Sequence, residues 1–163
     1  MSARKRNKAA AARKGRSAAR LNAVQALYQV EVGEDAPTAV ITQFLRHRLS
    51  GDMDGEKVVA ADADFFQDIV AGTISRQAEI DGFVGASLTG GYTVDRLETL
   101  LRALLRAGTY EMLVRVDVPA KVIINEYVDV AHAFFGGSEP TLANAVLDKV
   151  ARTIRDGEVG TAD

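Results

Sequence analysis

The strongest constraint on the fold is an uninterrupted helical pattern of apolar residues in the centre of the chain. The apolar positions are Leu97, Leu100, Leu101, Leu104, Leu105, Gly108 and Met112. Residues at spacings of three, four and seven share one face of a helix, and such a face has to be buried against other elements. Arg102 and Arg106 lie on the opposite face. The pattern predicts an amphipathic helix that runs from Tyr92 to Met112, and with it a helical core.

The same periodicity recurs along most of the chain and is bounded by residues that start or stop helices. Further helices are predicted at 21–32, 38–49, 62–84, 119–134 and 140–154. Pro119 follows an acid, Asp117, that could cap its helix, and Pro140 starts the last helix by the same logic. The Gly/Asp-rich segment 50–57 is predicted to be a plain loop, and no strand or hairpin pattern is seen. The predicted fold class is all-α.

Composition limits the chemistry that the chain can perform. The chain has 163 residues, 47% of them apolar, which is enough for a single core. It has no cysteine, which excludes disulfides, thiolate metal sites and a cysteine nucleophile. The two histidines, His47 and His132, are predicted to be surface residues. Since no glycine-rich phosphate loop and no nucleophile motif is present either, we predict no catalytic centre, metal or cofactor.

The charge is distributed very unevenly. The net charge is −2, but residues 1–20 contain eight basic residues and no acid. The rest of the chain keeps 12 basic and all 22 acidic residues, a net charge of −10. The basic residues of this N-terminal arm are Arg4, Lys5, Arg6, Lys8, Arg13, Lys14, Arg16 and Arg20. Such an arm is typical of nucleic-acid binding, in which cations bind phosphates and release counterions.

Two targeting roles compete with nucleic-acid binding for this arm. A secretory signal is excluded because no apolar stretch follows the basic residues. A mitochondrial transit peptide would share the composition, but it would be amphipathic, and no large apolar residue precedes Leu21. We therefore favour nucleic acid. Without a transmembrane-length apolar stretch, the chain is expected to be soluble. Residues 1–16 are predicted to be a flexible nucleic-acid-binding arm, 17–156 a single helical domain, and 157–163 a frayed tail.

Four segments together resemble the NusB family of transcription antitermination factors. They are AVQALYQ at 23–29, LRAGTYEM at 105–112, DVPAKVIINE at 117–126 and NAVLDK at 144–149. Their order and spacing match the family from about Arg16 to Arg155. The last two segments are specific in combination, although each alone would be weak.

This resemblance implies an all-helical fold of two small bundles packed together, with six to seven helices, and no enzymatic activity. It implies that the protein binds the boxA element of ribosomal RNA leader transcripts together with NusE, a ribosomal protein of the small subunit. The complex would act in the cytoplasm on RNA polymerase elongation complexes, with other Nus factors. Whether the free protein is a monomer or a homodimer stays open.

The resemblance also suggests which residues bind. Arg16 and Arg20 are expected to bind RNA from their position relative to the AVQALYQ segment, whereas the basic residues before Arg16 are expected to do so on charge alone. Tyr28 is expected near both RNA and NusE. At the last interhelical turn, Leu142 stands where the family often has an aromatic residue near the RNA, and Glu139 stands in for an acid. Leu101 and Glu139 are further expected contacts of the protein partner.

Two other functions were weighed. A NusB-like domain also begins an rRNA cytosine methyltransferase, so the chain could be a stand-alone RNA-binding module related to that enzyme. The chain stops at Asp163 with no methyltransferase domain behind it, which counts against this alternative. A helical DNA-binding repressor with a basic arm is a third reading, but no helix-turn-helix pair is recognisable.

Overall fold

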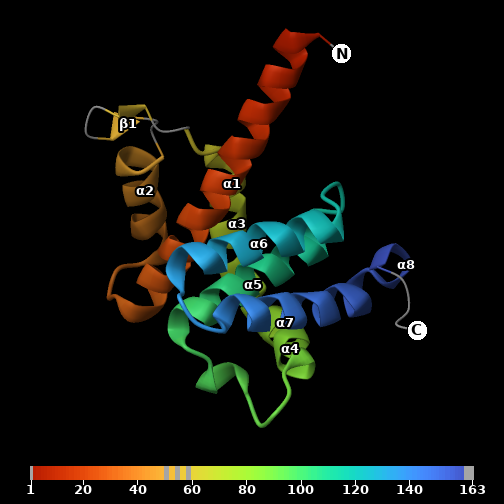
Figure 1. Cartoon of the computed structure of the whole chain (residues 1–163). Helices are drawn as coiled ribbons and strands as arrows, with labels where there is room; N and C mark the ends of the chain where they lie inside the picture. The colour runs from red at the N-terminus through yellow and green to blue at the C-terminus, as the bar shows by residue number, and fades with distance from the viewer. Residues whose placement is uncertain (1, 50–51, 54–55, 58–59, 160–163) are drawn as a thin grey trace. The chain divides into compact units, whose positions relative to one another are not determined.

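The computed structural model of the chain describes residues 2–49, 52–53, 56–57 and 60–159 (Figure 1). It is built from helices, which confirms the predicted all-α class. The chain divides into two compact units, Met1–Ala71 and Gly72–Asp163, here called unit 1 and unit 2. Within the described residues, no helix is long and apolar enough to cross a membrane.

Unit 1 contains α1 (Ala3–Val32), α2 (Pro37–His47) and most of α3 (Ala63–Ser75). In Figure 1, α2 lies beside the C-terminal half of α1. Side-chain contacts fix their antiparallel register: Gln29 donates to Gln43 at 3.1 Å, and Arg48 donates to Gln25 at 3.5 Å. Phe44 of α2 stacks on Phe66 of α3 with 5.6 Å between the ring centroids, so aromatic packing joins α2 to α3.

The first helix is much longer than predicted. It begins at Ala3 and not at Leu21, because residues of high helix propensity, including the four alanines 9–12, extend it towards the N-terminus. The Ser2 hydroxyl accepts a hydrogen bond from the Lys5 N–H at 3.3 Å and caps the first turn. The basic arm is therefore part of α1 in this structure. Its flexibility in solution stays a prediction.

The loop predicted at 50–57 contains a very short hairpin. β1 (Asp52–Met53) and β2 (Glu56–Lys57) pair antiparallel, with Asp52 opposite Lys57 and Met53 opposite Glu56. The prediction of no hairpin was therefore wrong at these four residues. Strands of two residues are too short for an alternating apolar pattern to reveal them. The rest of the predicted loop, 50–51 and 54–55, lies outside the described residues.

Unit 2 contains the remainder of the helices. They are α4 (Gln77–Ser87), the 3-10 helix η1 (Val94–Arg96), α5 (Thr99–Val114), α6 (Ala120–Phe134), α7 (Glu139–Ile154) and α8 (Asp156–Val159). The predicted apolar face of α5 is buried, with Leu104 and Leu105 inaccessible to solvent. A Cβ added at Gly108 would lie 3.0 Å from the Leu147 side chain and 3.3 Å from Tyr127. The absence of a side chain at Gly108 therefore lets α5 approach α6 and α7 closely.

Two predicted helices differ at their boundaries. The helix expected at 62–84 is two helices, because the chain breaks at Arg76, next to the point where the apolar stripe is interrupted at Gln77. The helix expected from Tyr92 begins at Thr99. Before it, Gly90 and Gly91 adopt φ values of +68° and +81°, which glycine tolerates and which produce the predicted break.

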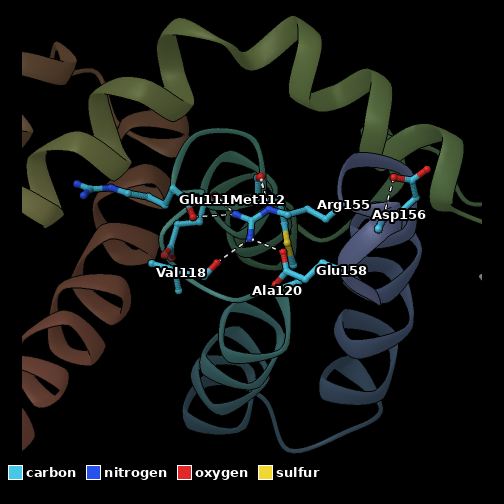
Figure 2. A network of polar contacts seen from close by, with 9 residues as sticks. Glu111, Met112, Val118, Ala120, Arg155, Asp156 and Glu158 are labelled. Carbon is cyan, nitrogen blue, oxygen red and sulfur yellow. Dashed lines mark hydrogen bonds and ion pairs between the residues drawn. The ribbon is translucent and has the colours of Figure 1, made fainter. Parts of the chain in front are cut away.

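The start of α6 is held by a different acid from the one predicted. Pro119 is the N-cap of α6, and the carboxylate that accepts from the Ala120 N–H belongs to Glu158 of α8 (Figure 2). This hydrogen bond and the neighbouring Arg155 guanidinium lower the pKa of Glu158. The expectation that Asp117 caps α6 was wrong, because an acid from the end of the chain occupies that role.

Arg155 closes the end of unit 2. Its guanidinium donates to the carbonyl oxygens of Met112 at 3.0 Å, Val118 at 2.7 Å and Arg115 at 2.7 Å, and it lies 3.1 Å from the Glu158 carboxylate. Figure 2 shows the Arg155 guanidinium between Met112, Val118 and Glu158. Residues 156–159 form the short helix α8. The predicted frayed tail, 157–163, begins within this helix and stays a prediction, and 160–163 lie outside the described residues.

Candidate nucleic-acid interface

Within unit 1, the basic helix α1 is anchored at Gly15 to the segment that precedes α3. The Gly15 carbonyl oxygen accepts a hydrogen bond from the Asp62 N–H at 2.9 Å. A Cβ at Gly15 would lie 3.3 Å from the Ala60 carbonyl oxygen, so the close approach favours glycine here. The Asp62 carboxylate in turn caps α3 by accepting from the Phe65 N–H at 3.0 Å. The same residue thus starts α3 and holds α1.

Before Gly15, α1 presents its cations to solvent. The exposed basic residues are Arg4, Lys5, Arg6, Lys8, Arg13 and Lys14. Successive helical residues are rotated by 100°, so these cations point in several directions around the helix axis. No acid lies in the first turn, where an acid would complement the helix dipole. This part of α1 therefore carries a concentrated positive charge, as a phosphate-binding arm requires.

Arg16 and Arg20 lie beyond the anchor and pack on a ring. Their guanidinium carbons are 4.8 Å and 4.9 Å from the centroid of the Phe65 ring. Arg16 is half-buried, and only 2% of Arg20 is exposed. Arg20 therefore contributes mainly to packing in this structure, and Arg16 is the more accessible of the two expected RNA contacts.

Tyr28 lies on the same helix and is 38% exposed. It sits one turn after Gln25, where the end of α2 meets α1 through Arg48. An exposed aromatic ring of this kind can stack on a base or fill a pocket of a protein partner. Its placement is compatible with both roles expected for it.

The three remaining predicted site residues belong to unit 2. Leu142 and Glu139 are half-buried in the first turns of α7, one turn apart. Leu101 is only 3% exposed, because it faces the core of its unit from α5. Leu101 was expected to contact a protein partner, but in this structure its side chain is already buried within unit 2. Glu139 and Leu142 stay available as contacts.

Phe65 is the functional residue that sequence reasoning missed. It holds two of the expected RNA-binding arginines, but it is far from both in the sequence. The pair Phe65–Phe66 at the start of α3 showed that an aromatic side chain was present there. The spacing of apolar residues in α3 did not show that the Phe65 ring would contact α1 and the Phe66 ring α2. A contact between residues so distant in the chain needs the fold to reveal it.

Within the described ranges, no cluster of three or more acidic or histidine side chains could hold a metal ion. The features that stand out are instead the cationic N-terminal turns of α1, their anchor at Gly15, and the exposed Tyr28. Together they define a class: a helical protein with a cationic helix suited to a polyanionic ligand.

Comparison with known proteins gives the family. Residues 17–152 match the model of the NusB family. The chain is 48% identical over 140 residues to the transcription antitermination protein NusB of Sinorhizobium fredii, with 86% of this chain and 88% of the relative covered. It is also 48% identical over 143 residues to that of Nitrobacter hamburgensis, with 88% and 89% covered. The chain belongs to the NusB family, as the resemblance indicated, and this membership agrees with a protein that is not an enzyme.

Solved structures support the fold. A NusB structure from T. maritima superposes with a TM-score of 0.68 at 23% identity, covering 84% of this chain and 90% of that one. A crystal structure of the antitermination factors NusB and NusE in complex with double-stranded RNA gives a TM-score of 0.69 at 19% identity, covering 85% and 96%. At these identities the likeness establishes the NusB fold.

Proposed function

We propose that this protein is an RNA-binding transcription antitermination factor that binds boxA of ribosomal RNA leader transcripts together with NusE. In this role it supports processive transcription by RNA polymerase elongation complexes that carry other Nus factors, and it acts in the cytoplasm. Family membership supports the antitermination role. The NusB relative bound to NusE and RNA supports the choice of partners.

The observation that carries the RNA-binding part is the charge of α1. Six exposed cations precede the Gly15 anchor, and no acid accompanies them in residues 1–20. Residues 1–16 are proposed to form the RNA-binding arm, with Arg16 at its base. The match to the family model begins at residue 17, so the arm adds to the family core. The net charge of −10 in the rest of the chain favours a basic protein partner.

Each remaining site residue has a role in this proposal. Tyr28 is proposed to lie where RNA and NusE meet. Glu139 is proposed to face NusE and Leu142 the RNA, from the first turns of α7. Leu142 is aliphatic and cannot stack on a base as an aromatic residue would, so its contribution to RNA binding is apolar contact.

The methyltransferase-related alternative is not favoured. The curated relatives that match this chain over most of their length are antitermination proteins. Their 88% and 89% coverage leaves little of each relative unmatched. The proposal therefore keeps antitermination as the function.

A titration tests the joint RNA site. Labelled boxA RNA is titrated with the protein alone and with an equimolar mixture of the protein and NusE, and a scrambled RNA and a duplex DNA serve as controls. We expect tighter binding to boxA RNA when NusE is present, and weaker binding to both controls. An affinity that does not change with NusE contradicts the joint site, and equal binding to all three nucleic acids contradicts sequence recognition.

A further inference from the structure

We propose that the C-terminal end of α2 is a second RNA contact, which binds backbone phosphates of nucleotides flanking the segment held by α1. The residues are Arg46, His47 and Arg48, here called the α2 cationic end. This inference rests on the proposed RNA-binding function and extends it to a surface outside the N-terminal arm.

The α2 cationic end belongs to the same compact unit as the arm. Because α2 is antiparallel to α1, its last residues return towards the N-terminal half of α1, and Arg48 donates to Gln25 at 3.5 Å. Arg16 lies nine residues before Gln25, about 14 Å along the helix axis. Nine residues are two and a half helical turns, so Arg16 and Gln25 lie on opposite sides of α1. A single-stranded RNA that contacts both Arg16 and the α2 cationic end therefore has to pass around α1, which calls for nucleotides beyond the segment held by the arm.

The side chains at this end are available for a ligand. Arg46 and His47 are exposed, and neither has a polar partner among the residues that the structure describes. Arg48 is held in place because its guanidinium carbon lies 5.0 Å from the Phe44 ring centroid, and its charge stays at the surface. Two arginines thus add positive charge to unit 1, and an imidazole adds a ring that can stack or hydrogen-bond.

The surface beside these residues is hollowed on the outer face of α2. The hollow is shallow and open to solvent, with a volume of about 420 Å³. Its lining residues are Thr38, Ala39, Thr42, Gln43, Arg46 and His47. Hydroxyl and amide groups together with the Arg46 guanidinium are groups that can bind a sugar-phosphate. In the sequence the charge changes sign after Leu49, where three acids follow at 52, 54 and 56.

A purely structural role would explain part of this pattern, because cations in the last turn of a helix complement its dipole. That role is local and involves no RNA. The two explanations predict different salt dependences of RNA binding for a variant that lacks these cations. The slope of log K against log salt becomes smaller only if a removed cation binds phosphate.

The test uses the full-length protein with Arg46→Ala and His47→Ala combined, and two RNAs: a minimal boxA RNA and one extended on both sides. Alanine maintains the helix, so the fold is expected to be retained. We expect a loss of about fivefold in affinity at about 0.1 M salt for each lost phosphate contact, and a smaller salt slope, for the extended RNA. The minimal RNA is expected to lose less. Arg76→Ala is the matched control, since that exposed arginine is paired with Glu79 at 2.9 Å.

Three outcomes overturn the inference. Wild-type affinity and salt slope for the extended RNA would show that the α2 cationic end does not contact RNA. An equal loss for both RNAs would place the contact inside boxA and not in its flanks. A loss that occurs only in the presence of NusE would assign the surface to the protein partner. In each case the arm variant described in the Discussion tests the proposed function separately, because it removes the charges of α1 alone.

Discussion

Arginine contacts of two kinds stand out in the two units of the molecule. In unit 2, arginines lie against carboxylates: Arg106 pairs with Asp81 at 2.8 Å and Arg152 with Asp148 at 2.9 Å. In unit 1, Arg16, Arg20 and Arg48 instead lie over phenylalanine rings at 4.8 to 5.0 Å. A carboxylate cancels the charge of its partner, whereas a ring orients a guanidinium and leaves its charge in place.

This difference explains how an acidic protein can bind RNA at one place. Unit 2 contains 9 basic and 13 acidic residues, a net charge of −4, and a net negative charge repels RNA. Residues 1–20 contain eight basic residues and no acid, and phosphates are suitable partners for this charge. The comparison predicts that removing cations from unit 1 changes RNA binding with little effect on stability. Removing the central cation of unit 2 should do the reverse.

The largest effect is expected for the arm. Replacing all six exposed basic residues before Gly15 with alanine removes the charge and keeps good helix formers in place. If all six bind phosphate, the slope of log K against log salt should fall by about 4, and affinity should fall by more than about 100-fold at 0.1 M salt. Fluorescence anisotropy at several salt concentrations measures both quantities.

Two controls accompany the arm variant. Arg76→Ala and Arg152→Ala remove paired charges from unit 2 and should leave the salt slope unchanged. Circular dichroism should show that the arm variant keeps its thermal unfolding transition. If the arm variant binds boxA RNA with wild-type affinity and slope, the RNA-binding role of α1 is wrong.

A smaller effect, on stability, is expected for Arg155→Ala. Arg155 is 9% exposed and satisfies several carbonyl oxygens at the end of α5. Without it these oxygens lose charged donors, and the free energy of unfolding should fall by about 3 kcal/mol. Urea denaturation followed by circular dichroism measures the change.

Arg152→Ala is the matched control for Arg155. Its ion pair with Asp148 is about 40% exposed on both sides, so its loss should cost less than about 1 kcal/mol. RNA affinity, measured well below the unfolding transition, should be unchanged in both variants. Equal destabilisation by the two substitutions would show that the burial of Arg155 has no special role.

The smallest effect is expected for Glu158, whose pKa is lowered by the Ala120 N–H and Arg155. A carboxylate whose pKa is lower in the folded protein adds stability when ionised. That stability is present above its ordinary pKa of 4.5 and is lost as the pH falls through the folded value. Glu158→Gln lacks this term, so its melting temperature should lie below that of the wild type near neutral pH. The difference should shrink in acid; a constant difference would contradict the linkage.

Much of the helical fold could be predicted because local signals and packing agree. The apolar face of α5, the Pro140 start of α7 and the glycine turn at 90–91 each placed an element correctly. The errors came from features that compete with such signals. Alanines without large apolar neighbours concealed the first half of α1, and the gap at Gln77 did not reveal that the helix breaks at Arg76. Acids at 117 and 158 could both have capped α6, and only the fold distinguishes them.

The site was less predictable than the fold. The cationic arm followed from composition, because charge does not depend on the fold. The burial of Arg20 and of Leu101 could not be predicted from composition. In both cases burial depends on which face of a helix packs against another element. The resemblance to the family predicts which sequence positions bind. It does not predict whether the side chains at those positions are exposed, because packing decides that.

The hydrogen bond between Gly15 and Asp62 has a mechanical consequence. Residues 3–14 and residues 15–32 are parts of one helix, and this hydrogen bond fixes the backbone of α1 at the point where the run of exposed cations ends. The cationic part of α1 precedes this point. Each additional helical turn would extend its reach by about 5.4 Å without altering the core. The number of helical turns before Gly15 thus sets how far from the core of unit 1 the cations of the arm can meet a polyanionic ligand.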